Sequence, residues 1–201
     1  MDYAISENAV ARNSGFPVPQ SLGPRSFRSP SLYNPNMRLA VLTVSDRCSR
    51  GEMTDTAGPA VARLLRKHFP DAAIEPALVS DDEDAIAAML AAWSASGVAL
   101  ILTAGGTGFS PRDRTPEATR RVIDREAPGL AEAMRFQGGV KNKFAWLSRA
   151  VAGLKAGTLI VNLPGSERGA VDSLEAILPL IGHALEVAAG AQSHPSAPFS
   201  E

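Results

Sequence analysis

The chain has 201 residues, of which 45% are hydrophobic and 20% are charged, and its formal net charge at pH 7 is -1. These values are typical of one globular domain, and they disfavour a general affinity for nucleic acid or for an anionic membrane surface. The single cysteine, Cys48, excludes an internal disulfide and a cysteine-built zinc site, so a reducing, cytoplasmic location is expected.

The two ends of the chain differ in composition from the middle. Residues 1–36 are rich in Ser, Pro, Asn and Arg and lack hydrophobic periodicity, which predicts a disordered N-terminal extension. Met37 directly precedes the first predicted strand and is an alternative natural start. We predict one folded domain over residues 37–190 and a tail over residues 191–201.

The folded part begins with alternating strand and helix signals. A compact aliphatic run over 39–44 predicts a strand, and apolar residues with helical spacing after Gly58 predict a helix. A second strand is predicted over 73–79, where Pro76 indicates an edge position because proline cannot donate to a neighbouring strand. An acidic turn beginning at Ser80 then starts the next predicted helix.

The centre of the chain carries its most specific signal. After the helix that ends at Gly97, the apolar run 98–102 predicts a buried strand, and three glycines follow it at Gly105, Gly106 and Gly108. Glycine lacks a Cβ, so its backbone N–H can approach an anion closely. The string lacks the lysine of a P-loop and the spacing of GxGxxG, which disfavours both motifs. A plain tight turn is the alternative interpretation.

The C-terminal half continues the alternation of strands and helices. A helix is predicted from Thr115, acting as N-cap, to about Glu126, where Pro128 and Gly129 interrupt it. The remaining predicted elements are a short helix ending near Gly138 and Gly139, a partly helical segment over 141–153, a buried strand over 158–163 and a last helix containing Pro179. This order predicts an α/β fold, a three-layer αβα sandwich with a mainly parallel central sheet.

Each predicted strand is followed by a polar or glycine-rich turn. The carboxyl ends of parallel strands meet at one edge of a sheet, where open α/β sheets bind ligands. Asp46, Asp81 and Asp113 would then lie on one rim, and such carboxylates repel one another unless a cation neutralises them. Mg²⁺ is the natural candidate because it prefers oxygen ligands and is often shared with phosphates. The arginines suited to binding those phosphates are Arg47, Arg112 and Arg114.

Several strings resemble the MogA-type molybdopterin adenylyltransferases of molybdenum cofactor biosynthesis and the related plant G domain. They are LTVSDRCSRG, DTAGP, VSDDEDAI, LILTAGGTGFSPRDRTPEATRRVIDREAPGLAEAMR, FAWLSRAVAGLKAGTLIVNLPGS and LEAILPLIGHALE. The resemblance covers about Met37 to Gly190 and is strongest in the central string. It implies a domain that binds molybdopterin and Mg-ATP, transfers AMP to the terminal phosphate of the pterin and releases pyrophosphate.

The resemblance also implies roles for individual residues. The two essential aspartates of the family, catalytic and Mg²⁺-binding, correspond to Asp81 and Asp113, although Ser80 stands where the family usually has proline, which leaves Asp82 as an alternative to Asp81. The candidate substrate-binding residues are Ser45, Asp46, Gly105, Gly106, Thr107, Gly108, Arg112, Ser148, Asn162, Pro164 and Gly165.

The family is usually trimeric, so a homotrimer is expected, and a molybdenum-insertion protein is a candidate partner. Two other interpretations stay open at this point. One is a MoaB-like or CinA-like relative that keeps the fold and uses the site differently. The other is a non-catalytic pterin-binding or scaffold module.

Overall fold

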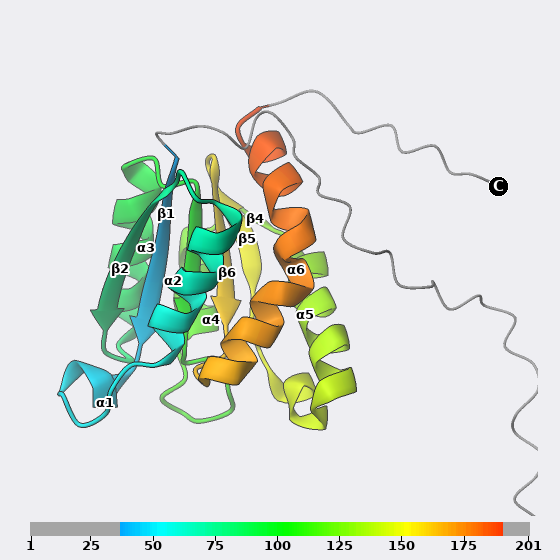
Figure 1. The fold of residues 1–201 in the computed structure, drawn as a ribbon. Coiled ribbons are helices and arrows are strands. Elements are labelled where there is room, and N and C mark those ends of the chain that lie inside the picture. The colour runs from blue at the N-terminus through cyan, green and yellow to red at the C-terminus, as the bar shows by residue number, and fades with distance from the viewer. Residues whose placement is uncertain (1–36, 191–201) are drawn as a thin grey trace, which may run out of the picture.

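The computed structural model describes residues 37–190, so the predicted extension and tail lie outside the described residues. Six strands form one sheet in the order β2-β1-β3-β6-β5-β4 (Figure 1). The strands are β1 (Arg38–Val44), β2 (Ala73–Val79), β3 (Leu100–Ala104), β4 (Arg125–Glu126), β5 (Ala152–Lys155) and β6 (Thr158–Leu163). The first four in the sheet order pair in parallel, while β5 pairs antiparallel with both of its neighbours.

Helices cover both faces of the sheet, which confirms the predicted three-layer α/β sandwich (Figure 1). One layer contains α2 (Ala57–His68), α5 (Pro128–Lys141) and α6 (Glu167–Ala188), and the other contains α3 (Glu83–Ala95) and α4 (Thr115–Val122). Side chains alternate along β1, so that Leu39 and Val41 pack toward the first layer while Ala40 and Leu42 pack toward the second.

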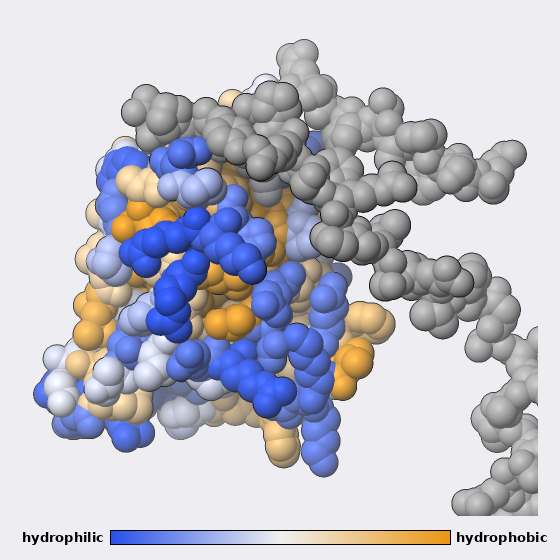
Figure 2. Space-filling view, viewed as in Figure 1, coloured by the Kyte–Doolittle hydropathy of each residue, from blue (hydrophilic) through white to orange (hydrophobic). Residues whose placement is uncertain are grey.

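Burial follows each strand's place in the sheet. All five residues of β3 are buried, because this strand has neighbours on both sides and helices on both faces. By contrast, β2 lies at the edge with Pro76 inside it, as predicted. Hydrophilic side chains cover much of the outer surface over α2 and α6 (Figure 2). None of the helices within residues 37–190 is both long enough and apolar enough to span a membrane.

Several predicted boundaries were wrong. The strand predicted over 98–102 is observed as Leu100–Ala104, two residues further along the chain. The helix that follows the glycine turn ends at Val122, and Arg125–Glu126 instead form β4, paired with the unpredicted strand β5. The next helix, α5, continues through Gly138 and Gly139. These two glycines serve close packing instead of ending the helix. A Cβ on Gly138 would collide with Ala145, and one on Gly139 with Trp146, both in the 3₁₀-helix η2 (Lys143–Leu147), which packs against α5.

Candidate functional site

A cleft of about 630 Å³ lies at the carboxyl ends of β3 and β6. Its walls come from the glycine turn after β3, from η2 with the end of α5, and from the first turns of α6. The predicted site residues that line it are Gly106, Thr107, Gly108, Asp113, Ser148, Pro164 and Gly165. Three separate parts of the chain therefore meet at this edge of the sheet.

The glycine turn adopts a backbone that side chains would obstruct. Gly105 and Gly106 have φ of 122° and 63°, in the region that favours glycine. A Cβ on Gly105 would meet the backbone carbonyl oxygen of Val44, and one on Gly106 would meet the Thr115 hydroxyl. The N–H of Gly105 also donates to the carbonyl of Leu163 at 3.1 Å. The turn therefore packs closely against the end of β1 and the start of α4, and it is hydrogen-bonded to the end of β6.

Helix α4 begins differently from the prediction. Its N-cap is Arg114, and Thr115 is the first helical residue. The Thr115 side chain is fully buried, and its Oγ1 has no hydrogen-bond partner within residues 37–190. This hydroxyl instead occupies the space beside Gly106, so the absence of a Cβ at Gly106 lets the turn approach the start of α4.

Two reciprocal hydrogen bonds join Asp46, at the end of β1, to Asp81, at the end of β2. The N–H of Asp46 donates to Oδ2 of Asp81, and the N–H of Asp81 donates to Oδ1 of Asp46, both at 2.9 Å. The second oxygen of Asp46 forms an ion pair with Arg112. Ser45 caps the short helix α1 (Asp46–Ser49), where its hydroxyl accepts from the N–H of Cys48 at 3.2 Å. These four predicted residues form a rim outside the lining of the cleft.

The carboxylate of Asp113 influences that of Asp81. Burial, and next the negative charge of Asp113, raise the pKa of Asp81, while Arg50 acts in the opposite direction. A divalent cation between the two carboxylates would relieve this repulsion. Within residues 37–190, no group of three or more His, Cys, Asp or Glu side chains is placed to hold a metal. Mg²⁺ sites in proteins often have only one or two carboxylate ligands, and phosphate and water complete the coordination, so two carboxylates are compatible with such an ion.

The structure separates Asp81 from its sequence neighbour. Asp82 is the N-cap of α3, and its Oδ1 accepts from the N–H of Ala85 at 2.8 Å. Its side chain is therefore used in starting the helix, whereas Asp81 bonds across to Asp46 at the rim. Between the two candidates, the geometry favours Asp81.

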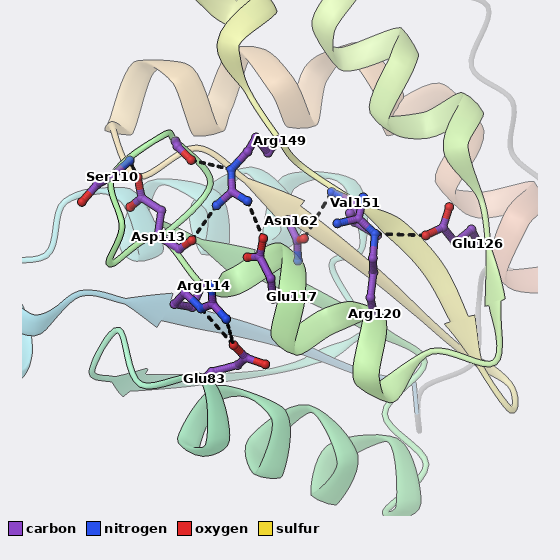
Figure 3. A network of polar contacts seen from close by, with 11 residues as sticks. Glu83, Ser110, Asp113, Arg114, Glu117, Arg120, Glu126, Arg149, Val151 and Asn162 are labelled. Carbon is purple, nitrogen blue, oxygen red and sulfur yellow. Dashed lines mark hydrogen bonds and ion pairs between the residues drawn. The ribbon is translucent and has the colours of Figure 1, made fainter.

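Two residues predicted to bind a ligand have side chains that form hydrogen bonds within the protein. Asn162 is fully buried, away from the cleft lining, and its amide donates to the hydroxyls of Thr103 (3.1 Å) and Thr119 (2.8 Å). It joins β6 to β3 and α4 behind the cleft, and its predicted contact with substrate stays a prediction. Arg114, expected to bind phosphate, donates to Glu83 at 2.6 Å and joins α4 to α3 (Figure 3).

Sequence reasoning missed part of the cleft. Residues that line it but were not singled out include Lys141, Asn142, Arg168 and Asp172. Lys141 donates to Asp172 at 2.6 Å, which joins the end of α5 to the first turns of α6. The one signal that would have found Lys141 is a helix continuing through Gly138 and Gly139, which the glycine pair concealed.

The fold and the cleft together define a three-layer α/β domain with an open cleft at the carboxyl edge of its sheet, beside a glycine turn and paired aspartates. A family model described as "Probable molybdopterin binding domain" matches residues 40–183. The chain therefore belongs to the MogA/MoaB family of molybdenum cofactor biosynthesis proteins.

Known relatives support this membership. A molybdopterin adenylyltransferase of Helicobacter pylori is 33% identical over 156 residues, which are 77% of this chain and 89% of the relative. A crystal structure of MoaB from Thermus thermophilus is 51% identical with a TM-score of 0.71, and the match covers 77% of this chain and 97% of that one. The Drosophila melanogaster molybdenum cofactor synthesis protein cinnamon is 37% identical over 76% of this chain.

Some of these relatives are much longer than the matched region. The chain spans 26% of cinnamon and about half of the bifunctional molybdenum cofactor biosynthesis proteins of Synechococcus elongatus (47%) and Chlorobaculum tepidum (50%).

Proposed function

We propose that this protein is a molybdopterin adenylyltransferase, which transfers AMP from Mg-ATP to the terminal phosphate of molybdopterin and releases pyrophosphate. Relatives from Helicobacter pylori and Haemophilus influenzae that carry this name are 33% and 35% identical to the chain. The observation that carries the proposal is the cleft at the carboxyl ends of β3 and β6, where the glycine turn and Asp113 form part of the lining. The hydrogen-bonded pair Asp46 and Asp81 lies at the ends of β1 and β2 in the same sheet, and the negative charge of Asp113 acts on the pKa of Asp81.

In this proposal the cleft holds the pterin, and the acidic rim holds the triphosphate together with Asp113, which also lines the cleft. Asp81 and Asp113 would bind Mg²⁺, which supplies charge neutralisation on the transferring phosphate. Backbone N–H groups of the glycine turn and the guanidinium of Arg112 would steady the phosphate oxygens. A terminal phosphate oxygen of the pterin attacks the α-phosphorus in line, a new P–O bond forms, and the bond to the bridging oxygen breaks with loss of pyrophosphate.

A MoaB-like role is the second candidate, because the Thermus thermophilus MoaB structure is 51% identical to this chain. Such a protein would keep the fold and use the cleft differently. The expected homotrimer, a molybdenum-insertion partner and a cytoplasmic location stay predictions. Exposed apolar side chains on α5 and η2, including Phe136, Val140 and Trp146, would suit a subunit interface.

One assay separates these candidates. Purified protein is incubated with molybdopterin, ATP and Mg²⁺, and both adenylylated pterin and pyrophosphate are quantified. We expect the two products in equal amounts, with turnover lost on chelation of Mg²⁺ and restored by its return. Pterin binding without either product would overturn the adenylyltransferase proposal and favour a binding module.

Replacing Asp82 with alanine tests the choice between the neighbouring aspartates. Because Asp82 caps α3, Asp82→Ala should lower the free energy of unfolding by about 1 kcal/mol. AMP transfer should stay close to the wild-type rate, since the variant keeps Asp81. Urea denaturation and the turnover assay measure the two effects. A folded Asp82→Ala protein without turnover would show that Asp82 is the functional carboxylate.

A further inference from the structure

Arg149 binds the backbone of the candidate active-site loop at several points. Its Nε donates to the carbonyl oxygen of Gly108 at 2.6 Å, and its Nη2 donates to the carbonyl oxygen of Asp113 at 2.5 Å. Its backbone N–H donates to the carbonyl of Thr107 at 2.9 Å. Figure 3 shows the guanidinium lying between Asp113 and Glu117, and its Nη1 forms an ion pair with the carboxylate of Glu117.

These contacts close a loop. Gly108 and Asp113 are the two ends of a six-residue segment. The planar guanidinium of Arg149 donates to the carbonyl oxygens of both residues, and no other side chain has this fork of donors. Within the segment, Oδ2 of Asp113 accepts from the N–H of Ser110 at 2.9 Å. The direction of the Asp113 carboxylate therefore depends on the loop that Arg149 fastens.

Glu117 holds the guanidinium from the other side. Burial acts to raise the pKa of Glu117. Hydrogen bonds from Arg149 and from the Glu117 backbone N–H, together with the positive charges of Arg149 and Arg114, keep this pKa below its ordinary value. The carboxylate is thus charged at neutral pH and fixes Arg149 to the first turn of α4. Arg149 itself is not among the residues that line the cleft.

We propose that Arg149 is a positioning residue, which fixes the segment from Gly108 to Asp113 so that the Asp113 carboxylate is presented to the same ligand as Asp81. Arg149 touches no reacting atom and acts through the loop. The proposal rests on the proposed function, because the loop matters only where Asp113 takes part in the reaction.

The kinetic test compares Arg149→Ala with Arg120→Ala. Arg120 lies on α4 and forms an exposed ion pair with Glu126 at 3.2 Å, so its loss controls for removing a surface arginine. We expect kcat for AMP transfer to fall about 100-fold in Arg149→Ala, with little change in KM for molybdopterin, because a small misplacement of a catalytic group has an effect of this size. Millimolar guanidinium should restore part of kcat. A general folding defect would show no such rescue.

A second measurement does not depend on activity. Hydrogen exchange of the loop should accelerate in Arg149→Ala at the N–H groups of Ser110 and Asp113, whereas exchange in β3 should match that of the wild type. If the wild-type protein forms no adenylylated pterin, the proposed function fails, and this measurement still tests whether Arg149 fixes the loop.

Should Arg149→Ala fail to fold, Glu117→Gln provides the same test, since glutamine keeps the shape but removes the charge that holds the guanidinium. We expect the same pattern, a lower kcat with unchanged KM and faster loop exchange. Wild-type kcat together with wild-type loop exchange in a folded variant of Arg149 or Glu117 would overturn the proposal.

Discussion

Asp113→Asn is expected to reduce AMP transfer by about 1,000-fold, while molybdopterin binding stays near the wild-type affinity. The amide has the shape of the carboxylate and can still accept from the N–H of Ser110, so the loop keeps its conformation. What disappears is the negative charge that, with Asp81, would hold Mg²⁺ across the triphosphate. Single-turnover formation of adenylylated pterin and calorimetric titration with molybdopterin measure the two quantities.

The matched control for this variant is Asp84→Asn. Asp84 is an exposed carboxylate in the first turn of α3 that pairs with Arg121 at 2.8 Å, and it lies outside the cleft lining. Its neutralisation should leave transfer unchanged, because an exposed ion pair contributes little and the site keeps both of its own carboxylates. Loss of pterin binding in folded Asp113→Asn would contradict the division between a pterin cleft and an acidic rim.

Much of the fold follows from local patterns in the sequence. The strands 73–79 and 158–163 were predicted with their observed bounds, because each is an apolar run between polar or glycine-rich turns. The meeting of the turns at one edge followed from parallel pairing, which depends only on the alternation of strands and helices. These predictions needed no knowledge of long-range contacts.

The incorrect predictions concern features that depend on contacts between distant segments. Gly138 and Gly139 have the composition of a helix end, yet they allow η2 to pack on α5, which no local pattern reveals. The short strands β4 and β5 exist because they pair with each other and because β5 also pairs with β6. The direction of a side chain is a further feature of this kind: Asn162 follows buried strand residues in sequence, and its side chain is buried against Thr103, while its predicted contact with substrate stays a prediction. A sequence pattern identifies a polar residue at a strand end without fixing the direction of its side chain.

Gly105→Ala is expected to lower the free energy of unfolding by roughly 2–5 kcal/mol, a large part of the 5–15 kcal/mol of an ordinary domain. Two effects add at this position. A φ of 122° is strained for alanine, and the new Cβ would meet the carbonyl oxygen of Val44. That oxygen belongs to the backbone of β1, and the N–H of Gly105 is itself bonded to Leu163, so neither partner can move freely.

Gly97→Ala separates the two effects. Gly97 also has a positive φ, 80°, but a Cβ there would have nothing within 4 Å. Its substitution should therefore cost only the backbone strain, about 1–2 kcal/mol. Urea denaturation of both variants gives, by difference, the loss caused by the collision and by the larger φ of Gly105, and we expect about 1–3 kcal/mol. Equal losses in the two variants would mean that the glycine turn has room to relax, and that its close approach to β1 does not require a glycine.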